Sequence, residues 1–256
     1  MDRTLPLRTG AGTEELAGAG AAARGTAAGP LVSVIVPTLD EERVLSSLLD
    51  HLAGLAGHFE FVVADGGSTD ATVACARAHA LAPRVVEATG GRARQLNVAA
   101  KSARGDLLVF LHADSRLPAG AYSSLASAWS DQAVVGGNFA LRFEGDDLFA
   151  RALTAVYAVQ RRLGYFYGDS SIWVRAADFV ALSGFREISV MEDYDLARRL
   201  ARRGRVACLP GPARTSSRRW RRMGVGRTVL AWTTIRWLYL LGVPPQRLAG
   251  LYRHAR

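Results

Sequence analysis

The sequence predicts an α/β fold with a mostly parallel central sheet and helices on both faces. Short and mostly apolar runs, at Leu31–Val36, Phe59–Ala64 and Asp106–Leu111, alternate with longer stretches of helical periodicity. This alternation is typical of parallel strands joined by crossover helices. The chain has 256 residues, of which 49% are hydrophobic and 21% are charged. It is therefore long enough to bury one large α/β core.

Acidic residues follow each of these three runs directly. They are Asp40, Glu41 and Glu42 after the first run, Asp65 after the second and Asp114 after the third. Because ligands of such sheets bind at the carboxyl ends of the strands, near a switch in strand order, we expect these carboxylates to converge on one ligand.

The first half of the chain supplies the other predicted elements at regular intervals. Apolar residues at helical spacing predict a helix over 41–52, and Ser68 or Thr69 is the expected N-cap of a helix that ends near His79. Gly90 and Gly91 form a turn between a short strand and a helix that carries Arg94. The further elements predicted here are the strand at 84–87, the helix at 93–103 and a helix begun by Pro118.

The second half is less regular. The predicted strands are 134–143, 171–174 and 206–209, and the predicted helices are 147–163, 176–183 and 192–204. The apolar stretch 228–243 is about 16 residues long, shorter than the roughly 20 that span a bilayer. With Trp232 and Trp237 it suits a membrane interface, and a core helix packed on the sheet fits equally well.

Charge and cysteine content indicate which partners and which cellular compartment suit this chain. The net charge is +9, and Lys101 is the only lysine, so nearly all positive charge is arginine. Such a chain can meet nucleic acid, anionic lipid or a phosphorylated substrate. Cys75 and Cys208 form neither a disulfide framework nor a metal cluster, which fits a reducing cytoplasm. We expect residues 1–30 to be a disordered tail, because they are rich in Gly, Ala and Thr.

A nucleotide-diphosphate ligand would suit this pattern. Glu41 and Asp65 can accept hydrogen bonds from ribose and base, and Asp114 can hold Mg²⁺ or Mn²⁺ against the phosphates. Arg92 and Arg94 lie in a glycine-led turn that opens a helix, where they can neutralise phosphate charge. Each feature alone also has a structural explanation, as a turn former or a solvated helix face.

Five segments carry a family resemblance. SVIVPTLDEE, DGGSTD, GRARQLN, LLVFLHADS and MEDYDL occur in the order seen in family 2 glycosyltransferases of GT-A (Rossmann-like) fold. The likeness covers about Leu31 to Arg222, followed by a C-terminal helical segment at 223–256. The chain is particularly similar to the compact subgroup with His-Ala-Asp in place of Asp-X-Asp, described for arsenosugar-type biosynthesis enzymes.

The resemblance implies roles for individual residues. The positions that would bind the donor are Pro37, Glu41, Asp65, Arg92, Arg94, Arg218, Arg219 and Trp220. Asp193, beside Glu192, would be the catalytic base of an inverting transfer. Tyr167 and Asp169 would bind the acceptor. Asp114 would bind the metal; His112, where most members have aspartate, is either a second ligand or a hydrogen-bond partner.

The resemblance therefore implies a transferase that moves a sugar from a nucleotide-diphosphate sugar to a hydroxyl acceptor, which is a small molecule or a lipid. An inactive glycosyltransferase-like scaffold is the alternative. A sugar-nucleotide-forming nucleotidyltransferase would carry a GxGxR segment after the first strand, where this chain has PTLDEE. No nucleic-acid-binding motif occurs. We expect a cytoplasmic protein, with peripheral attachment to the inner face of the plasma membrane as a further expectation.

Overall fold

A computed structural model describes residues 29–162, 166–216 and 225–254. Its centre is one eight-stranded sheet with strand order β3-β2-β1-β4-β7-β6-β8-β5. The strands are β1 (Val32–Thr38), β2 (Phe59–Asp65), β3 (Arg84–Glu87), β4 (Leu107–Phe110), β5 (Ser115–Arg116), β6 (Val134–Phe143), β7 (Trp173–Arg175) and β8 (Arg205–Thr215).

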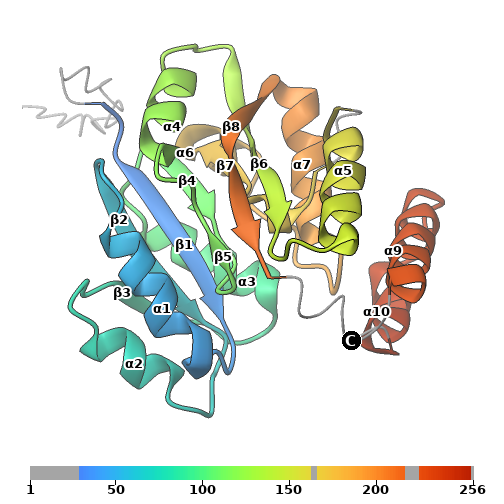
Figure 1. Ribbon diagram of the computed structural model, residues 1–256, viewed down its shortest axis with the longest axis horizontal. Helices are drawn as coiled ribbons and strands as arrows, with labels where there is room; N and C mark the ends of the chain where they lie inside the picture. The colour runs from blue at the N-terminus through green and yellow to red at the C-terminus, as the bar shows by residue number, and fades with distance from the viewer. Residues whose placement is uncertain (1–28, 163–165, 217–224, 255–256) are drawn as a thin grey trace, which may run out of the picture.

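Helices cover this sheet and extend beyond it (Figure 1). They are α1 (Glu42–Ala53), α2 (Thr72–Ala78), α3 (Arg92–Ser102), α4 (Ala121–Trp129), α5 (Leu148–Arg162), α6 (Ala176–Ala181), α7 (Glu192–Arg203), α9 (Val225–Leu240) and α10 (Pro245–His254). A short 3-10 turn, η1, spans Gly168–Ser170.

The predicted α/β architecture is confirmed. Strands β1, β2, β3 and β4 are mutually parallel, whereas β7 runs antiparallel between β4 and β6. The chain moves outward from β1 through β2 to β3 and then returns to place β4 on the other side of β1. The carboxyl ends of β1, β2 and β4 therefore meet at a switch in strand order, where α/β sheets bind ligands.

Two hydrophobic clusters lie on opposite faces of the sheet. Val34 and Val36 of β1 pack with Leu45 of α1 and Leu125 of α4. Ile35, between those valines, packs instead with residues of α3, α6 and α7. This division follows from the strand geometry, because successive side chains point to opposite faces. Both faces are buried, which explains why most residues of β1 are apolar.

Some predicted boundaries were wrong. Neither Ser68 nor Thr69 caps α2: the N-cap is Ala71, because the side chain of Ser68 bonds to Asp65 and that of Thr69 to Asp40. Strand β8 continues past Pro210, where the sequence predicted its end. A register shift between Phe139 and Leu141 of β6 accommodates the Pro-Gly-Pro segment within the pairing.

The C-terminal helices α9 and α10 form a hairpin against the start of α7. Ile235 and Leu248 are buried there with Met191 and Tyr194. Figure 1 shows the hairpin at the side of the sheet where α5 and α7 lie. Among the described residues, no helix combines the length and apolarity needed to cross a membrane.

Candidate active site

Asp65 ends β2 in a dense set of hydrogen bonds. Its carboxylate accepts hydrogen bonds from the backbone N–H groups of Gly67 (2.9 Å) and Ser68 (2.8 Å). The hydroxyls of Ser68 (2.5 Å) and Thr38 (3.1 Å) donate to its other oxygen. Burial alone would raise the pKa of Asp65, but these four donors outweigh it and lower the pKa. Asp65 is thus a fixed, ionised acceptor.

The turn after β1 is tied to the turn after β2. Asp40 adopts a left-handed conformation (φ 54°), and its carboxylate accepts the backbone N–H of Thr69 at 2.8 Å. In return, the hydroxyl of Thr72 accepts the backbone N–H of Glu41 at 2.8 Å. Pro37 is half-buried in β1 beside Ala64 of β2. The structure therefore brings three predicted donor residues, Pro37, Glu41 and Asp65, to one edge of the sheet.

Gln95 is a component of this edge that the sequence analysis did not select. Its side chain is buried and donates to the carbonyl oxygens of Thr38, at 2.8 Å, and Ala64. Gln95 thereby clamps the ends of β1 and β2 to α3. The sequence feature that could have identified Gln95 is its position in the GRARQ segment, one helical turn after Arg92.

Arg92, at the start of α3, lies among side chains from three other segments. Its guanidinium contacts Glu192 Oε1 at 3.2 Å and His112 Nε2. Because a guanidinium can only donate, this contact requires the tautomer in which Nε2 accepts and Nδ1 carries the proton. That nitrogen faces Asp169 Oδ1 at 3.4 Å. The predicted residues Arg92, His112, Asp169 and Glu192 are therefore brought together.

Asp193 joins this cluster through η1. Its Oδ2 accepts the backbone N–H of Gly168 at 2.7 Å, and its Oδ1 accepts the backbone N–H of Tyr194 at 2.7 Å. A β-carbon on Gly168 would lie 2.9 Å from both Asp193 Oδ2 and His112 Nε2, and 3.1 Å from Arg92 Nη2. Gly168 thus sits at the centre of the cluster, where no other residue type fits without displacement.

Asp169 and Asp193 adjoin a cluster of three tyrosines, of which Tyr194 is buried and Tyr157 and Tyr167 are half-buried. Tyr157 hydrogen-bonds Asp169, and burial raises the pKa of Tyr157 well above its ordinary value, so its hydroxyl stays protonated. Tyr167 stacks on Tyr194, with ring centroids 5.4 Å apart, and bonds to Arg236 of α9. Burial, first among the causes, raises the pKa of Tyr167. The ring of Tyr167 is therefore packed, and its hydroxyl reaches the C-terminal hairpin.

Asp114 differs from the other acidic residues. It follows β4, is half-buried, and its carboxylate has no hydrogen bond or ion pair within the described part of the chain. Its own backbone carbonyl accepts the N–H of Ser216 at 3.3 Å, which brings the end of β8 beside it. Across residues 29–162, 166–216 and 225–254, no group of three or more His, Cys, Asp or Glu side chains is arranged to hold a metal ion.

The structure says less about the remaining residues predicted to bind the donor. Arg94 is exposed on α3, with its side chain 3.1 Å from the site of a β-carbon on Gly90. Arg218, Arg219 and Trp220 lie outside the described residues.

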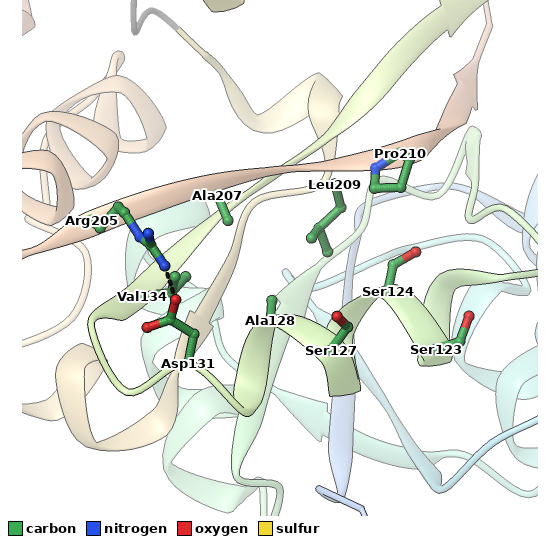
Figure 2. Close-up of a pocket in the computed structure, with 10 residues that line it drawn as sticks. All are labelled: Ser123, Ser124, Ser127, Ala128, Asp131, Val134, Arg205, Ala207, Leu209 and Pro210. Atoms are coloured by element: carbon green, nitrogen blue, oxygen red, sulfur yellow. Dashed lines mark hydrogen bonds and ion pairs between the residues drawn. The ribbon is translucent and has the colours of Figure 1, made fainter.

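A separate groove of about 450 Å³ lies between α4 and β8 (Figure 2). Its walls carry small side chains such as Ser127 and Ala207, and an ion pair between Asp131 and Arg205 closes one end. Val134 and Arg205 begin β6 and β8, so this end lies at the amino ends of strands, opposite the edge with Asp65 and Asp114. None of the predicted site residues lines this groove.

Comparison with known proteins assigns the chain to a family. The family model for "Glycosyl transferase family 2" matches residues 33–186, which is more than half of the chain. A PGL/p-HBAD biosynthesis glycosyltransferase of Mycobacterium bovis is 38% identical over 96 residues. That match covers 35% of this chain and 38% of the relative, so the chain spans well under half the length of that curated relative.

Solved structures share the fold at low sequence identity. The mannosyltransferase PcManGT of Pyrobaculum calidifontis, in complex with GDP-Man and Mn²⁺, is 22% identical with a TM-score of 0.64, covering 90% of this chain and 70% of that one. Glucosyl-3-phosphoglycerate synthase of Mycobacterium tuberculosis, with Mn²⁺, UDP and glucosyl-3-phosphoglycerate, is 22% identical with a TM-score of 0.56 over 84% of this chain and 81% of that one.

Proposed function

The chain belongs to glycosyl transferase family 2, and from this membership we propose that it transfers a sugar from a nucleotide-diphosphate donor to a hydroxyl acceptor with inversion. The observation that carries the proposal is the position of α3. Gln95 of this helix clamps the strand ends that carry Asp65, while Arg92 contacts Glu192, the neighbour of Asp193. One helix thus connects a candidate nucleoside pocket to a candidate base.

The donor would lie along the edge formed by β1, β2 and α3. Asp65 remains ionised, with its oxygens fixed by four donors, which suits a hydrogen-bond acceptor for a base or ribose. Arg94 and the glycine-led start of α3 would face the diphosphate. The binding of GDP-Man by PcManGT and of UDP by the mycobacterial synthase supports a nucleotide donor.

A divalent cation fits Asp114. This carboxylate has no hydrogen bond or ion pair among the described residues, although the charge of Arg116 acts on it at longer range. Mg²⁺ or Mn²⁺ commonly binds one or two carboxylates together with substrate phosphates. When bound, such a cation would neutralise the charge that develops on the leaving diphosphate. Both ring nitrogens of His112 already face protein groups, Arg92 and Asp169, which favours a hydrogen-bonding role over metal ligation.

Asp193 would act as the base. The backbone N–H groups of Gly168 and Tyr194 each bond to one of its oxygens, which fixes the carboxylate and leaves further lone pairs for an acceptor hydroxyl. Removal of the hydroxyl proton creates the nucleophile, and its direct attack on the anomeric carbon inverts that centre. Asp169 and Tyr167, next to Gly168, would position the acceptor. Residues 31–222 would form the catalytic domain.

The test is calorimetric titration of a panel of nucleotide diphosphates, with and without Mn²⁺, on the wild type and Asp114→Ala. We expect one nucleotide to bind in a manner that weakens when either Mn²⁺ or Asp114 is removed. Asp131→Ala is the matched control, because Asp131 is an exposed carboxylate at the amino ends of the strands, opposite this edge. If no nucleotide binds under any condition, the inactive-scaffold alternative replaces the proposal.

A further inference from the structure

The large apolar side chains that remain exposed are concentrated on one part of the molecule. Within the described residues, nine such side chains are exposed, and seven of them belong to α5, to α9 or to the residue that follows α9. These seven define what we call the α5–α9 face: Leu148, Val156, Val159, Leu230, Trp237, Leu240 and Leu241. Scattered apolar exposure is ordinary, whereas concentration on two helices marks a binding surface.

Helices α5 and α9 lie at the same side of the sheet (Figure 1), and each carries its exposed apolar residues at helical spacing. Leu230, Trp237 and Leu241 recur at intervals of seven and four residues, which places them along one side of a helix. Val156 and Val159 have the matching spacing on α5. Trp232 of α9 packs against the cluster formed by α5 and β6, and Figure 1 shows α5 and α9 at the same side of the sheet.

Positive charge predominates around the α9 part of this face. The chain contains no Asp or Glu after Asp195, yet it carries 15 arginines between Leu196 and its end. Helix α5 likewise contains arginines and no acidic residue. Arg151, Arg162, Arg227 and Arg247 are exposed on α5, α9 and α10. Acidic residues adjoin the face only before α5, at Glu144, Asp146 and Asp147. The apolar stripe of α9, with its tryptophan and neighbouring arginines, matches the interfacial region of an anionic bilayer.

We propose that the α5–α9 face docks peripherally on an anionic lipid bilayer. Trp237, Leu230 and Leu241 would enter the boundary between headgroups and acyl chains, and the exposed arginines would contact lipid phosphates. A second copy of this chain fits less well, because it would oppose arginines to arginines at the border of the contact.

The docked face would also be close to the candidate active site. Trp232 of α9 meets the ring of Tyr167 edge-on, with centroids 6.5 Å apart. The neighbour of Tyr167, Gly168, donates its N–H to Asp193. A bilayer held by α5 and α9 would therefore lie on the acceptor side of Asp193, where a lipid hydroxyl could approach. The docking itself does not depend on the proposed transfer reaction.

The experiment is sedimentation of the full chain with vesicles of phosphatidylcholine alone, or with about one third phosphatidylglycerol. We expect the wild type to bind the anionic vesicles about tenfold or more tightly than the neutral ones, and to lose affinity as salt is added. The double variant Trp237→Ser/Leu241→Ser should lose about tenfold or more in affinity. Val180→Ser is the matched control, because Val180 is equally exposed on α6, away from the face.

A second pair of substitutions tests the charges separately. Arg227→Glu/Arg247→Glu leaves the apolar stripe intact and should abolish the preference for anionic vesicles. Circular dichroism and nucleotide titration in lipid-free buffer would establish that each variant is folded, independently of docking. Wild-type binding by both double variants, or no binding by the wild type, would overturn the proposal. Loss of a wild-type dimer in Trp237→Ser/Leu241→Ser, measured by light scattering, would instead assign the face to a second copy.

Discussion

The backbone N–H of Gly168 donates a 2.7 Å hydrogen bond to Oδ2 of Asp193, across 25 residues of sequence. This bond fixes the carboxylate that we propose as the base. It also requires close approach of η1 to α7, because Gly168 has Asp193, His112 and Arg92 within 3.1 Å of the position of a β-carbon. The bond therefore depends on the absence of a side chain at position 168.

We expect Gly168→Ala to reduce the rate of sugar transfer by about a hundredfold or more. The added methyl group would displace Asp193 or η1 by a fraction of an ångström to an ångström, and displacement on that scale misaligns a catalytic group. Gly226→Ala is the matched control, since nothing lies within 4 Å of a β-carbon there. Steady-state transfer rates, with circular dichroism to verify folding, provide the measurement. Unchanged transfer by Gly168→Ala would remove the basis for the positioning role of Gly168.

Asp193→Asn should abolish transfer while donor affinity stays nearly constant. The amide keeps the shape of the carboxylate but cannot take a proton from the acceptor hydroxyl. Transfer rates and calorimetric donor titration on the same preparation separate the two effects. Turnover at the wild-type level in this variant would show that Asp193 is not the base.

His112→Ala distinguishes the two roles that the sequence leaves open for this residue. Because both ring nitrogens face protein groups, we expect turnover to fall about tenfold to a hundredfold, with the Mn²⁺ concentration for half-maximal activity unchanged. A large increase in that concentration would identify His112 as a metal ligand. His58→Ala, at an exposed histidine, serves as the control.

Asp65→Asn should destabilise the fold at neutral pH by about 1–3 kcal/mol, because the amide cannot accept all the hydrogen bonds that the buried carboxylate receives. The folded-state pKa of Asp65 is lowered below its unfolded value. Its contribution is thus complete above the unfolded pKa, near 4, and is lost as pH falls through the folded value. Urea unfolding at several pH values should therefore show a difference between wild type and variant that shrinks in acid. A difference independent of pH would contradict this account.

Asp195→Ala should be among the more damaging substitutions outside the candidate active site. This buried carboxylate is paired with Arg199 at 2.6 Å and Arg186 at 3.1 Å, and it accepts from the hydroxyl of Tyr239 at 3.3 Å. Removing it leaves Arg199 uncompensated in the interior, at a cost of about 3–5 kcal/mol. Denaturant titration measures the loss. Asp146→Ala, which breaks an exposed ion pair with Arg142, should change stability little.

Much of the fold could be predicted because local sequence patterns reflect it. The strands at Arg84–Glu87 and Val134–Phe143 have the limits expected from the sequence, and the family and α/β class are confirmed. The boundaries that failed depended on partners distant in sequence. Ser68 resembles an N-cap until Asp65 is seen to accept its hydroxyl, and β8 continues through Pro210 only because β6 pairs with it.

The candidate site, like the fold, has features that local sequence patterns predict and features that depend on distant partners. The sequence by itself determined which chemical groups are available, because acidic residues after apolar strands and an arginine after paired glycines are visible as local patterns. The membrane and core interpretations of the last helix both remained open at that level. Only the tertiary structure decided that α9 buries Ile235 against α7 while it exposes Trp237.

The contacts within the site also required the folded chain. Three sets of contacts join residues 20 to 57 positions apart: Gln95 with the ends of β1 and β2, His112 with Arg92 and Asp169, and Gly168 with Asp193. Such contacts leave no periodicity in the sequence, because packing of whole elements sets them. Residue chemistry is encoded locally, whereas the partner of each group is determined by the crossing of strands and helices.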